Sequence, residues 1–157
     1  MIFFHNPEEE NGYLSNWFMS QFEVDGVKFS SMEQYMMYKK AQLFQDDERM
    51  SGIMATCDVA EIKSLGRKVQ GFDDDIWNEN KYRIVKEGIK QKFVQNEELL
   101  EKLLSTGDEI LAECAVRDTI WGIGLSMGDN RRTDKKQWKG KNLLGKALME
   151  VRDELKS

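Results

Sequence analysis

The chain has 157 residues, of which 40% are hydrophobic and 32% are charged, and its formal net charge is −5 at pH 7. This length corresponds to about one globular domain, and the 10% aromatic content argues against a disordered chain. The acidic balance argues against a protein that binds nucleic acid over its whole surface, although it is compatible with a local phosphate site. We therefore predict a single domain over residues 1–157.

The pattern of apolar residues predicts a mostly helical α+β fold with a small N-terminal β-hairpin. Residues 2–4 form a short predicted strand, and apolar residues alternate on both sides of Asp25-Gly26, which indicates a two-residue hairpin turn. Later segments repeat apolar residues at helical spacing. Helices are predicted over 30–44, 46–55, 59–69, from 73–75 through 93, from 96 to 106–107 and over 142–155, with a strand at 110–115 and an irregular segment at 117–141.

Several classes of protein are excluded by what the sequence lacks. No apolar run approaches the 18 or more residues of a membrane span, and the first residues lack the features of a signal peptide. We therefore expect a cytoplasmic protein without a membrane partner. Cys57 and Cys114 are too few for a disulfide framework and are expected to be buried. His5 is the single histidine, which excludes two-histidine zinc motifs and leaves carboxylates, Lys or Tyr for acid–base chemistry.

A glutamate and a lysine lie two turns apart in the helix predicted over 30–44. Glu33 and Lys40 fall on nearly one line of that helix, about 10 Å apart along its axis. Facing a common apolar cleft, such a pair has shifted pKa values and serves as acid, base or nucleophile. The structural alternative, which the spacing alone favours, is that Glu33 completes a capping box with Ser30 and that Lys40 extends to water.

The segment 117–124 places a tryptophan between small residues. Trp121 beside Gly122 would form a stacking wall where the backbone approaches a ligand, and Asp118 would bind ribose hydroxyls or polarise water. Equally compatible is a loop that a buried Trp121 anchors, with Asp118 as a turn residue. The glycine spacing differs from that of the dinucleotide fingerprint.

Basic residues concentrate between positions 131 and 146 of this acidic chain. Lys141 and Asn142 lead into the last predicted helix, whose N-terminus would offer free N–H groups to a phosphorylated ligand. A solvated loop is the alternative for most of these lysines.

Three further residues have two interpretations each. Arg67 would clamp a phosphate or pair with a buried acid. Gly66 would end a helix or allow close packing. Trp77 would be a core residue or a ligand shelf.

Taken in order, these segments resemble the pattern of the NADAR (YbiA-like) superfamily. The resemblance spans essentially the whole chain, and the joint order and spacing of its parts are specific. The residues that carry it are Ser15-Asn16-Trp17, Asp25-Gly26, Ser31-Met32-Glu33-Gln34-Tyr35, Lys40, Ala60, Leu65-Gly66-Arg67, Trp77, Lys92-Phe93, Leu104, Thr106-Gly107, Glu113, Asp118, Trp121-Gly122, Gly124, Gly140-Lys141-Asn142, Leu144-Gly145, Leu148-Met149 and Arg152.

The resemblance implies a YbiA-like fold and an N-glycosidase that acts on ribosylated bases. The family has two substrate classes: phosphoribosylamino-pyrimidine intermediates of riboflavin synthesis, and ADP-ribose attached to guanine in nucleosides or nucleic acid. Both join a phosphorylated ribose through C1 to a nitrogen. The expected partner is thus a small phosphorylated ribosyl or ADP-ribosyl substrate, with ADP-ribosylated nucleic acid as a further one. We expect no metal and no cofactor.

The resemblance also assigns roles to the candidate residues. Glu33 would stabilise the cationic charge that grows at C1. Lys40 would attack C1 to give a Schiff base, and Asp118 would orient ribose or activate water. The remaining expected substrate-binding residues are Asn16, Trp17, Arg67, Trp77, Trp121, Gly122, Lys141 and Asn142.

The chain departs from the family pattern at a few positions. Asn78 stands where Asp is frequent and Val85 where Met is usual; we expect both in the core. The insert 125–138 resembles that of a branch with an extended loop. The main alternative function is a module that binds ADP-ribose or a nucleotide without turnover, and a structural docking protein is a third. The sequence does not determine the oligomeric state.

Overall fold

The computed structural model describes residues 1–156, which form two compact units. The middle unit comprises residues 19–96, and the terminal unit comprises residues 1–18 together with the chain from residue 97 on. Within the described chain no helix combines the length and the apolar composition that a bilayer-spanning segment requires.

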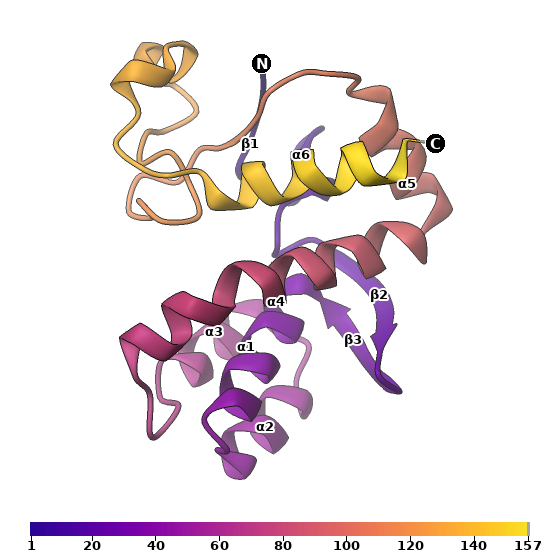
Figure 1. Ribbon diagram of the computed structural model, residues 1–157, viewed down its shortest axis with the longest axis vertical. Coiled ribbons are helices and arrows are strands. Elements are labelled where there is room, and N and C mark those ends of the chain that lie inside the picture. The colour runs from indigo at the N-terminus through magenta and orange to yellow at the C-terminus, as the bar shows by residue number, and fades with distance from the viewer. Residues whose placement is uncertain (157) are drawn as a thin grey trace. The chain divides into compact units, whose positions relative to one another are not determined.

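The elements of the two units make up the mostly helical α+β fold that the sequence predicts (Figure 1). The middle unit contains β2 (Met19–Val24), β3 (Val27–Ser31), α1 (Met32–Leu43), α2 (Asp47–Met54), α3 (Val59–Gly66) and α4 (Asp74–Val94). The terminal unit contains β1 (Ile2–Phe4), the 3-10 helix η1 (Gly12–Leu14), α5 (Glu97–Ser105), β4 (Leu111–Glu113), the 3-10 helices η2 (Asn130–Thr133) and η3 (Lys135–Gln137), and α6 (Leu143–Leu155).

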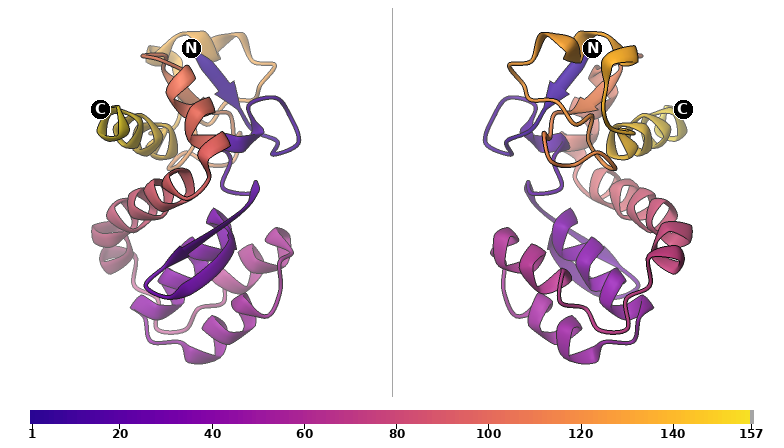
Figure 2. Two further views of the ribbon diagram at one scale, coloured as in Figure 1. Left: turned by 90° about the vertical axis from the view of Figure 1, so that its right-hand side faces the viewer. Right: turned by 90° about the vertical axis from the view of Figure 1, so that its left-hand side faces the viewer.

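The predicted hairpin is confirmed in the middle unit. Asp25 and Gly26 both have positive φ, 51° and 81°, as the tight turns that match the twist of paired strands require. The antiparallel strands β2 and β3 lie along α4 and α1, respectively (Figure 2). Phe22 and Phe29 face each other across the hairpin and contact the ring of Tyr35 on α1. The hairpin thereby buries one side of α1.

Helix α1 is the centre of the middle unit and packs against α2, α3, α4 and β3. Two glycines permit this close packing, because a Cβ on Gly66 would overlap the Sδ of Met37 and a Cβ on Gly88 would overlap the ring of Tyr35. The Tyr35 hydroxyl donates to the Ile84 carbonyl at 2.8 Å. Gly66 is the last residue of α3 and also a point of close packing, so both predicted roles of this glycine are confirmed.

The N-terminus of α1 corrects the expected capping box. Ser31, not Ser30, is the cap, and its hydroxyl accepts from the Gln34 N–H at 3.1 Å. The Oε1 of Gln34 accepts from the N–H of Ser30 at 2.7 Å, and its Nε2 donates to the Ile53 carbonyl. The capping function that we considered for Glu33 is therefore wrong, because Gln34 performs it from the next position.

The buried face of α4 contains a lysine as well as the predicted apolar residues. Ile84, Val85, Ile89 and Phe93 are buried, of which Val85 was expected in the core, and Lys92 is only 1% exposed. Burial lowers the pKa of Lys92 from its ordinary value of 10.5 to about 7. Between these two values the unfolded chain therefore carries a proton on this side chain that the folded chain releases.

We expect that burial of Lys92 makes stability rise with pH between about 7 and 10.5, since the unfolded state binds the additional proton there. The slope from a single group is at most about 1.4 kcal/mol per pH unit. Urea unfolding of the Lys92→Met variant at several pH values should show a flatter dependence than the unsubstituted protein. Lys90→Met, at a half-buried position of the same helix, is the matched control. Equal slopes in all three proteins would contradict the prediction.

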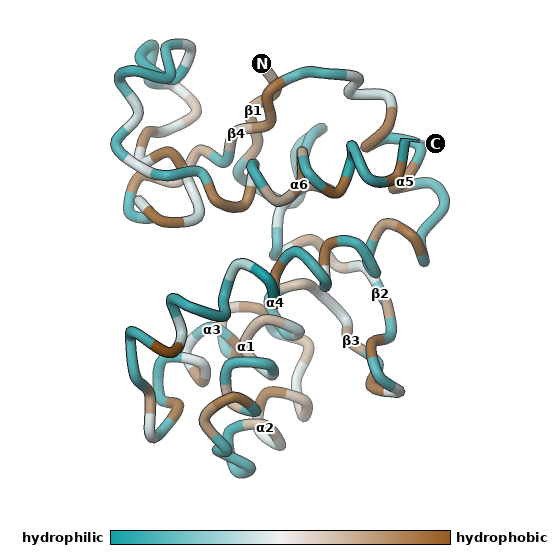
Figure 3. The backbone as a smooth tube through the Cα atoms, viewed as in Figure 1, coloured by the Kyte–Doolittle hydropathy of each residue, from teal (hydrophilic) through white to brown (hydrophobic). Residues whose placement is uncertain are grey.

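The terminal unit is built on a parallel pair of short strands. β1 pairs with β4 in the register Ile2↔Leu111 to Phe4↔Glu113. The buried residues of α6 recur at helical spacing and so form one face of the helix. Figure 3 shows apolar and polar segments alternating along it. Cys114 is buried, which raises the pKa of its thiol to about 11. Cys57 is exposed, so the expectation that it is buried is wrong.

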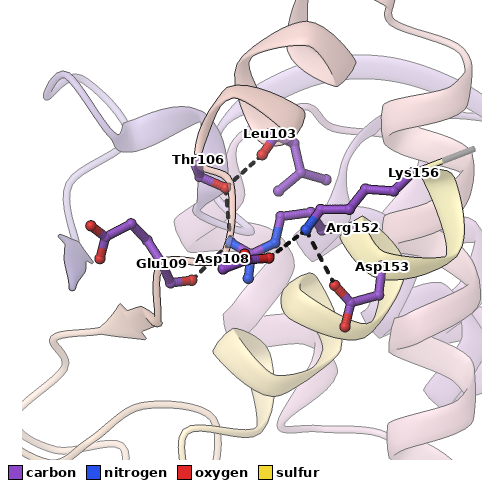
Figure 4. A network of polar contacts seen from close by, with 7 residues as sticks. All are labelled: Leu103, Thr106, Asp108, Glu109, Arg152, Asp153 and Lys156. Carbon is purple, nitrogen blue, oxygen red and sulfur yellow. Dashed lines mark hydrogen bonds and ion pairs between the residues drawn. The ribbon is translucent and has the colours of Figure 1, made fainter.

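An arginine fixes the end of α5 to α6 within the terminal unit (Figure 4). Arg152 is buried, and its Nη1 donates to Thr106 Oγ1 at 2.9 Å and to the Glu109 carbonyl at 2.8 Å. The Thr106 hydroxyl in turn donates to the Leu103 carbonyl at 2.5 Å. The Thr106 and Arg152 positions of the family pattern are therefore structural in this chain.

Candidate active site

The glutamate and the lysine of α1 lie at opposite ends of that helix. Glu33 stands in the first turn and Lys40 in the last turn. Glu33 is 4% exposed, whereas Lys40 is half-buried. Their charges interact, because the Glu33 carboxylate acts to raise the pKa of the Lys40 ammonium. The pair that the sequence singled out is thus coupled electrostatically.

The amine of Lys40 lies against aromatic rings rather than extending freely into water. Its Nζ is 4.6 Å from the centre of the Phe72 ring and 6.0 Å from that of Trp77. Burial lowers the pKa of Lys40; Arg67 acts in the same direction, and Glu33 and Asp74 oppose it. A lowered pKa increases the fraction of neutral amine near neutral pH, and only the neutral amine is a nucleophile.

Close packing of α3 on α1 places Arg67 near this lysine. Gly66 lies directly against Met37, which stands between Glu33 and Lys40 on α1. The next residue, Arg67, is the C-cap of α3 and is exposed, within electrostatic range of Lys40. Its guanidinium is therefore accessible to a phosphate, as the predicted phosphate-binding role of Arg67 requires.

Trp77 and Asn78 begin the long helix α4. Trp77 is half-buried in its first turns, with one ring face toward Lys40. Asn78 is exposed and accepts from Lys81 Nζ at 2.7 Å, so our placement of Asn78 in the core is wrong. Glu33, Lys40, Arg67 and Trp77 thus share one neighbourhood of the middle unit.

Asp118 shapes a turn in the terminal unit. Its Oδ1 accepts from the N–H groups of Ile120 and Trp121 at 3.0 and 2.8 Å. This is the turn-residue interpretation of Asp118, and the bonds involve one of its two carboxylate oxygens. Trp121 is half-buried, as is Trp17, whose N–H donates to Ser15 Oγ at 3.1 Å. Asn16, next to Trp17, is buried.

The N-terminus of α6 is closed by the chain itself. The N–H groups of Asn142, Leu143 and Leu144 donate to the carbonyls of residues 122, 120 and 121, each at 3.1 Å. The anion site that we predicted there is therefore wrong, because carbonyl oxygens of the preceding loop already accept from these three N–H groups. Lys141 is exposed, and its own N–H donates to the Thr119 carbonyl.

Asn142 joins α6 to β4. Its side chain is 3% exposed; Nδ2 donates to the Leu111 carbonyl at 2.9 Å, and Oδ1 accepts from the Glu113 N–H at 3.1 Å. Its φ of 53° lies in the left-handed region, which asparagine tolerates better than most residues. The expectation that Asn142 binds substrate is thus corrected, because its amide bonds to the protein's own backbone.

Two glycines of this region allow the same close packing of α6 and its preceding loop against β4. A Cβ on Gly122 would lie 3.0 Å from the carbonyl oxygens of Glu113 and Asp118, and a Cβ on Gly145 would overlap the Leu111 carbonyl. The close approach that we predicted between Gly122 and a ligand is an approach to protein backbone instead. Gly122 is buried, and the space that its side chain would take is filled by the protein's own atoms.

We expect Asn142→Gly to lower the free energy of unfolding by about 2–4 kcal/mol, since two backbone groups of β4 lose their partners. Glycine adopts the positive φ freely, so this variant isolates the loss of the side-chain bonds from backbone strain. Chemical denaturation measures the change, with Asn130→Gly at an exposed position of η2 as control. Unchanged stability of Asn142→Gly would show that the two bonds contribute nothing.

The basic insert is folded onto the small core of the terminal unit. Met127 and Trp138 pack against a buried cluster of Ala112, Cys114, Ile123 and Leu125. The Trp138 Nε1 donates to the Arg132 carbonyl at 2.8 Å, and the Arg132 guanidinium lies 4.8 Å from the centre of the Phe3 ring. The insert is thus a packed surface element, and most of its basic side chains are exposed, as the solvated-loop interpretation expects.

Sequence reasoning assigned no site role to Phe72 or Asp74, and it did not predict that Lys92, a residue of the family pattern, is buried. Phe72 lies in the loop just before Asp73, the N-cap of α4, where no periodic pattern marks it. An isolated aromatic residue just before a helix cap was the available signal. Among residues 1–156 no three His, Cys, Asp or Glu side chains are grouped so that they could hold a metal ion.

Comparison with known proteins defines the class. The sequence model of the NADAR domain family matches residues 2–156, and the chain belongs to this family. N-glycosidase R617 of Acanthamoeba polyphaga mimivirus is 40% identical, over 98% of this chain and 95% of that protein. Riboflavin biosynthesis protein VVA0006 of Vibrio vulnificus (strain YJ016) is 32% identical, over 98% of this chain and 38% of its own length.

A solved structure has the same fold. The NMR structure of the E. coli protein YbiA matches this chain with a TM-score of 0.80 at 29% identity, over 98% of this chain and 83% of that one. The YbiA-like fold that the sequence predicts is thereby confirmed.

Proposed function

We propose that this chain is an N-glycosidase that hydrolyses the C1–N bond between a phosphorylated ribosyl or ADP-ribosyl group and a base. The coarser class, a hydrolase of N-glycosidic bonds, is supported by membership of the NADAR family and by relatives named N-glycosidase. The substrate is an ADP-ribosylated guanine or an early phosphoribosylamino-pyrimidine of riboflavin synthesis. VVA0006, named for riboflavin biosynthesis, supports the second possibility.

The observation that carries the proposal is the environment of Lys40. Its amine is partly desolvated, lies against two aromatic faces and interacts with the charge of the buried Glu33. Desolvation of a lysine next to another cationic group is a recognised way to activate it as a nucleophile, and Arg67 supplies that second cation.

The proposed reaction begins with the ribose ring open and C1 bonded to the base nitrogen as an imine. The neutral Lys40 amine adds to C1 to give an aminal, and the C1–N bond to the base then breaks. Both protons that the lysine nitrogen loses are transferred to the base nitrogen, which departs as a neutral amine and leaves a Schiff base between C1 and Lys40. A water molecule then adds to C1 of the lysine Schiff base, and the lysine amine departs. The Glu33 carboxylate stabilises positive charge near C1 during both steps.

For the terminal unit we propose that Asp118 orients the ribose and that Trp17, Trp121, Asn16 and Lys141 contact substrate. The half-buried rings and the exposed lysine are compatible with these roles. Asn142 and Gly122 are left out, because they serve the joint between α6 and β4.

A substrate panel tests the function. Purified protein is incubated with ADP-ribosylated guanosine and with ribosylaminopyrimidine phosphate, and released base is measured by chromatography. Release from either one supports the glycosidase and identifies the substrate class. Binding measured by calorimetry without release from either substrate would favour the alternative, a module that only binds its ligand.

A further inference from the structure

Phe72 is a large apolar residue that stays 40% exposed beside the amine of Lys40. The Nζ of Lys40 is closer to the centre of this ring, at 4.6 Å, than to that of Trp77, at 6.0 Å. A cation within about 6 Å of a ring centre is attracted by the negative face of the aromatic system. Phe72 therefore provides the nearer of the two faces against which the ammonium rests.

The backbone around Phe72 is fixed on both sides. The N–H of Gln70 donates to Asp46 Oδ2 at 2.9 Å, which ties the segment to the N-cap of α2. Gly71 follows with a φ of 75°, a conformation that glycine adopts without strain. After Phe72, Asp73 caps α4 by accepting two N–H groups of its first turn. The exposed ring is thus held by its loop and not by burial.

Phe44 supports the same ring. It is the C-cap of α1, and its ring centre lies 5.3 Å from that of Phe72 at an angle of 59°. Tilted pairs at this distance are favourable. Phe44 and Lys40 both belong to the last turn and cap of α1, so Phe72 contacts that end of the helix at two side chains.

We propose that Phe72 is a positioning residue for Lys40: its ring face holds the flexible lysine side chain where the amine meets C1 of the sugar. The inference rests on the proposed function, because base release through Lys40 is the reaction that it serves. The charged groups that face this amine are Glu33 from α1, Asp74 from α4 and Arg67 from α3. The ring differs from them because its attraction is directional and requires the ammonium to lie over the ring face.

Three variants at Phe72 and one control separate the ring face from simple bulk. In Phe72→Leu, which keeps apolar cover but loses the ring, we expect kcat to fall about 10-fold or more from misplacement of the amine, with KM nearly unchanged. The low-pH limb of kcat/KM should move down by about half a pH unit, since the ammonium loses its aromatic partner. Phe72→Tyr and Phe72→Trp should restore both values. Ile76→Ala, which removes another exposed apolar side chain from the first turn of α4, should match the unsubstituted protein.

The opposite pattern would overturn the inference. If Phe72→Leu raises KM and leaves kcat and the pH profile unchanged, Phe72 contacts substrate and does not act through Lys40. If all Phe72 variants behave like the unsubstituted protein, the ring has no such role.

A second measurement does not need turnover. The pH dependence of Lys40 acetylation by acetic anhydride, followed on its peptide by mass spectrometry with Lys68 as an internal exposed reference, gives the pKa of the amine directly. A lower midpoint in Phe72→Leu, with the midpoint kept in Phe72→Tyr, supports the contact even if no substrate is cleaved; in that case the proposed function fails and the contact stands. Cleavage with unchanged midpoints and unchanged kcat in the variants would instead refute the inference and leave the function intact.

Discussion

Lys40→Ala should lose base release by about 10³-fold or more and retain much of its affinity for substrate. Removal of a nucleophile eliminates the covalent path, whereas the contacts that hold phosphate and base are made by other residues. Single-turnover release assays measure the loss, and calorimetry measures the remaining binding. Because Lys40 is only half-buried, the variant should fold, which a thermal melt checks.

Two controls make this result specific. Lys40→Arg keeps the positive charge but provides no neutral amine at ordinary pH, so it should be as inactive as Lys40→Ala. Lys39→Ala changes the neighbouring lysine, whose ammonium lies 3.7 Å from the Asp25 carboxylate, and should retain activity.

Borohydride added during turnover should reduce the Schiff base and attach the mass of the sugar to the peptide that contains Lys40. Full activity of Lys40→Ala would exclude the covalent mechanism.

Glu33→Gln should reduce kcat by about 10²-fold or more, the usual effect of removing a positioned acid–base or electrostatic group. The substitution keeps the shape of a side chain that is 4% exposed and removes its charge. It should also lower the pKa of Lys40 further, because the Glu33 carboxylate is the first of the groups that raise it. The low-pH limb of kcat/KM is therefore expected to move to lower pH while the plateau falls.

The control for Glu33 is the residue that does cap the helix. Ser31→Ala removes the hydroxyl that accepts from the Gln34 N–H and should cost about 1 kcal/mol of stability without moving the pH profile. If Glu33→Gln instead lowers only the melting temperature and leaves kcat unchanged, the role of Glu33 is structural.

Local patterns in the sequence were sufficient to predict the α-helices and strands of the fold, but not the short 3-10 helices η1, η2 and η3. Asp25-Gly26 predicts its hairpin because the turn needs two residues that tolerate positive φ, a property of those residues themselves. The helical spacing around Ile84, Val85 and Ile89 likewise predicts a buried helix face. The predicted helix cap was wrong by one position, because the pairs Ser30-Glu33 and Ser31-Gln34 both have the spacing of a capping box. Only the path of the chain ahead of the helix selects between them.

The residues of the candidate site likewise fall into those that local spacing identifies and those that only tertiary contacts identify. Glu33 and Lys40 could be singled out because seven residues return to one side of a helix, and that relation is local. Asn142 could not be assigned, because a helix N-terminus binds an anion only if no other acceptor reaches it, and the acceptors here come from the loop 120–122. No periodic pattern in the sequence marks Phe72 as a partner of Lys40, since a ring acts on an ammonium through distance and not through position along the chain.

By itself, the sequence determined the order of helices and strands and the carboxylate and amine on one helix, because periodicity and turn chemistry are properties of neighbouring residues. The family was recognised by resemblance, from the order and spacing of motifs along the whole chain. Only the tertiary structure decided which polar groups were already satisfied by the protein's own backbone, and which aromatic rings face the lysine. Those depend on contacts between segments that are distant in the chain, and such contacts set both desolvation and the supply of hydrogen-bond acceptors.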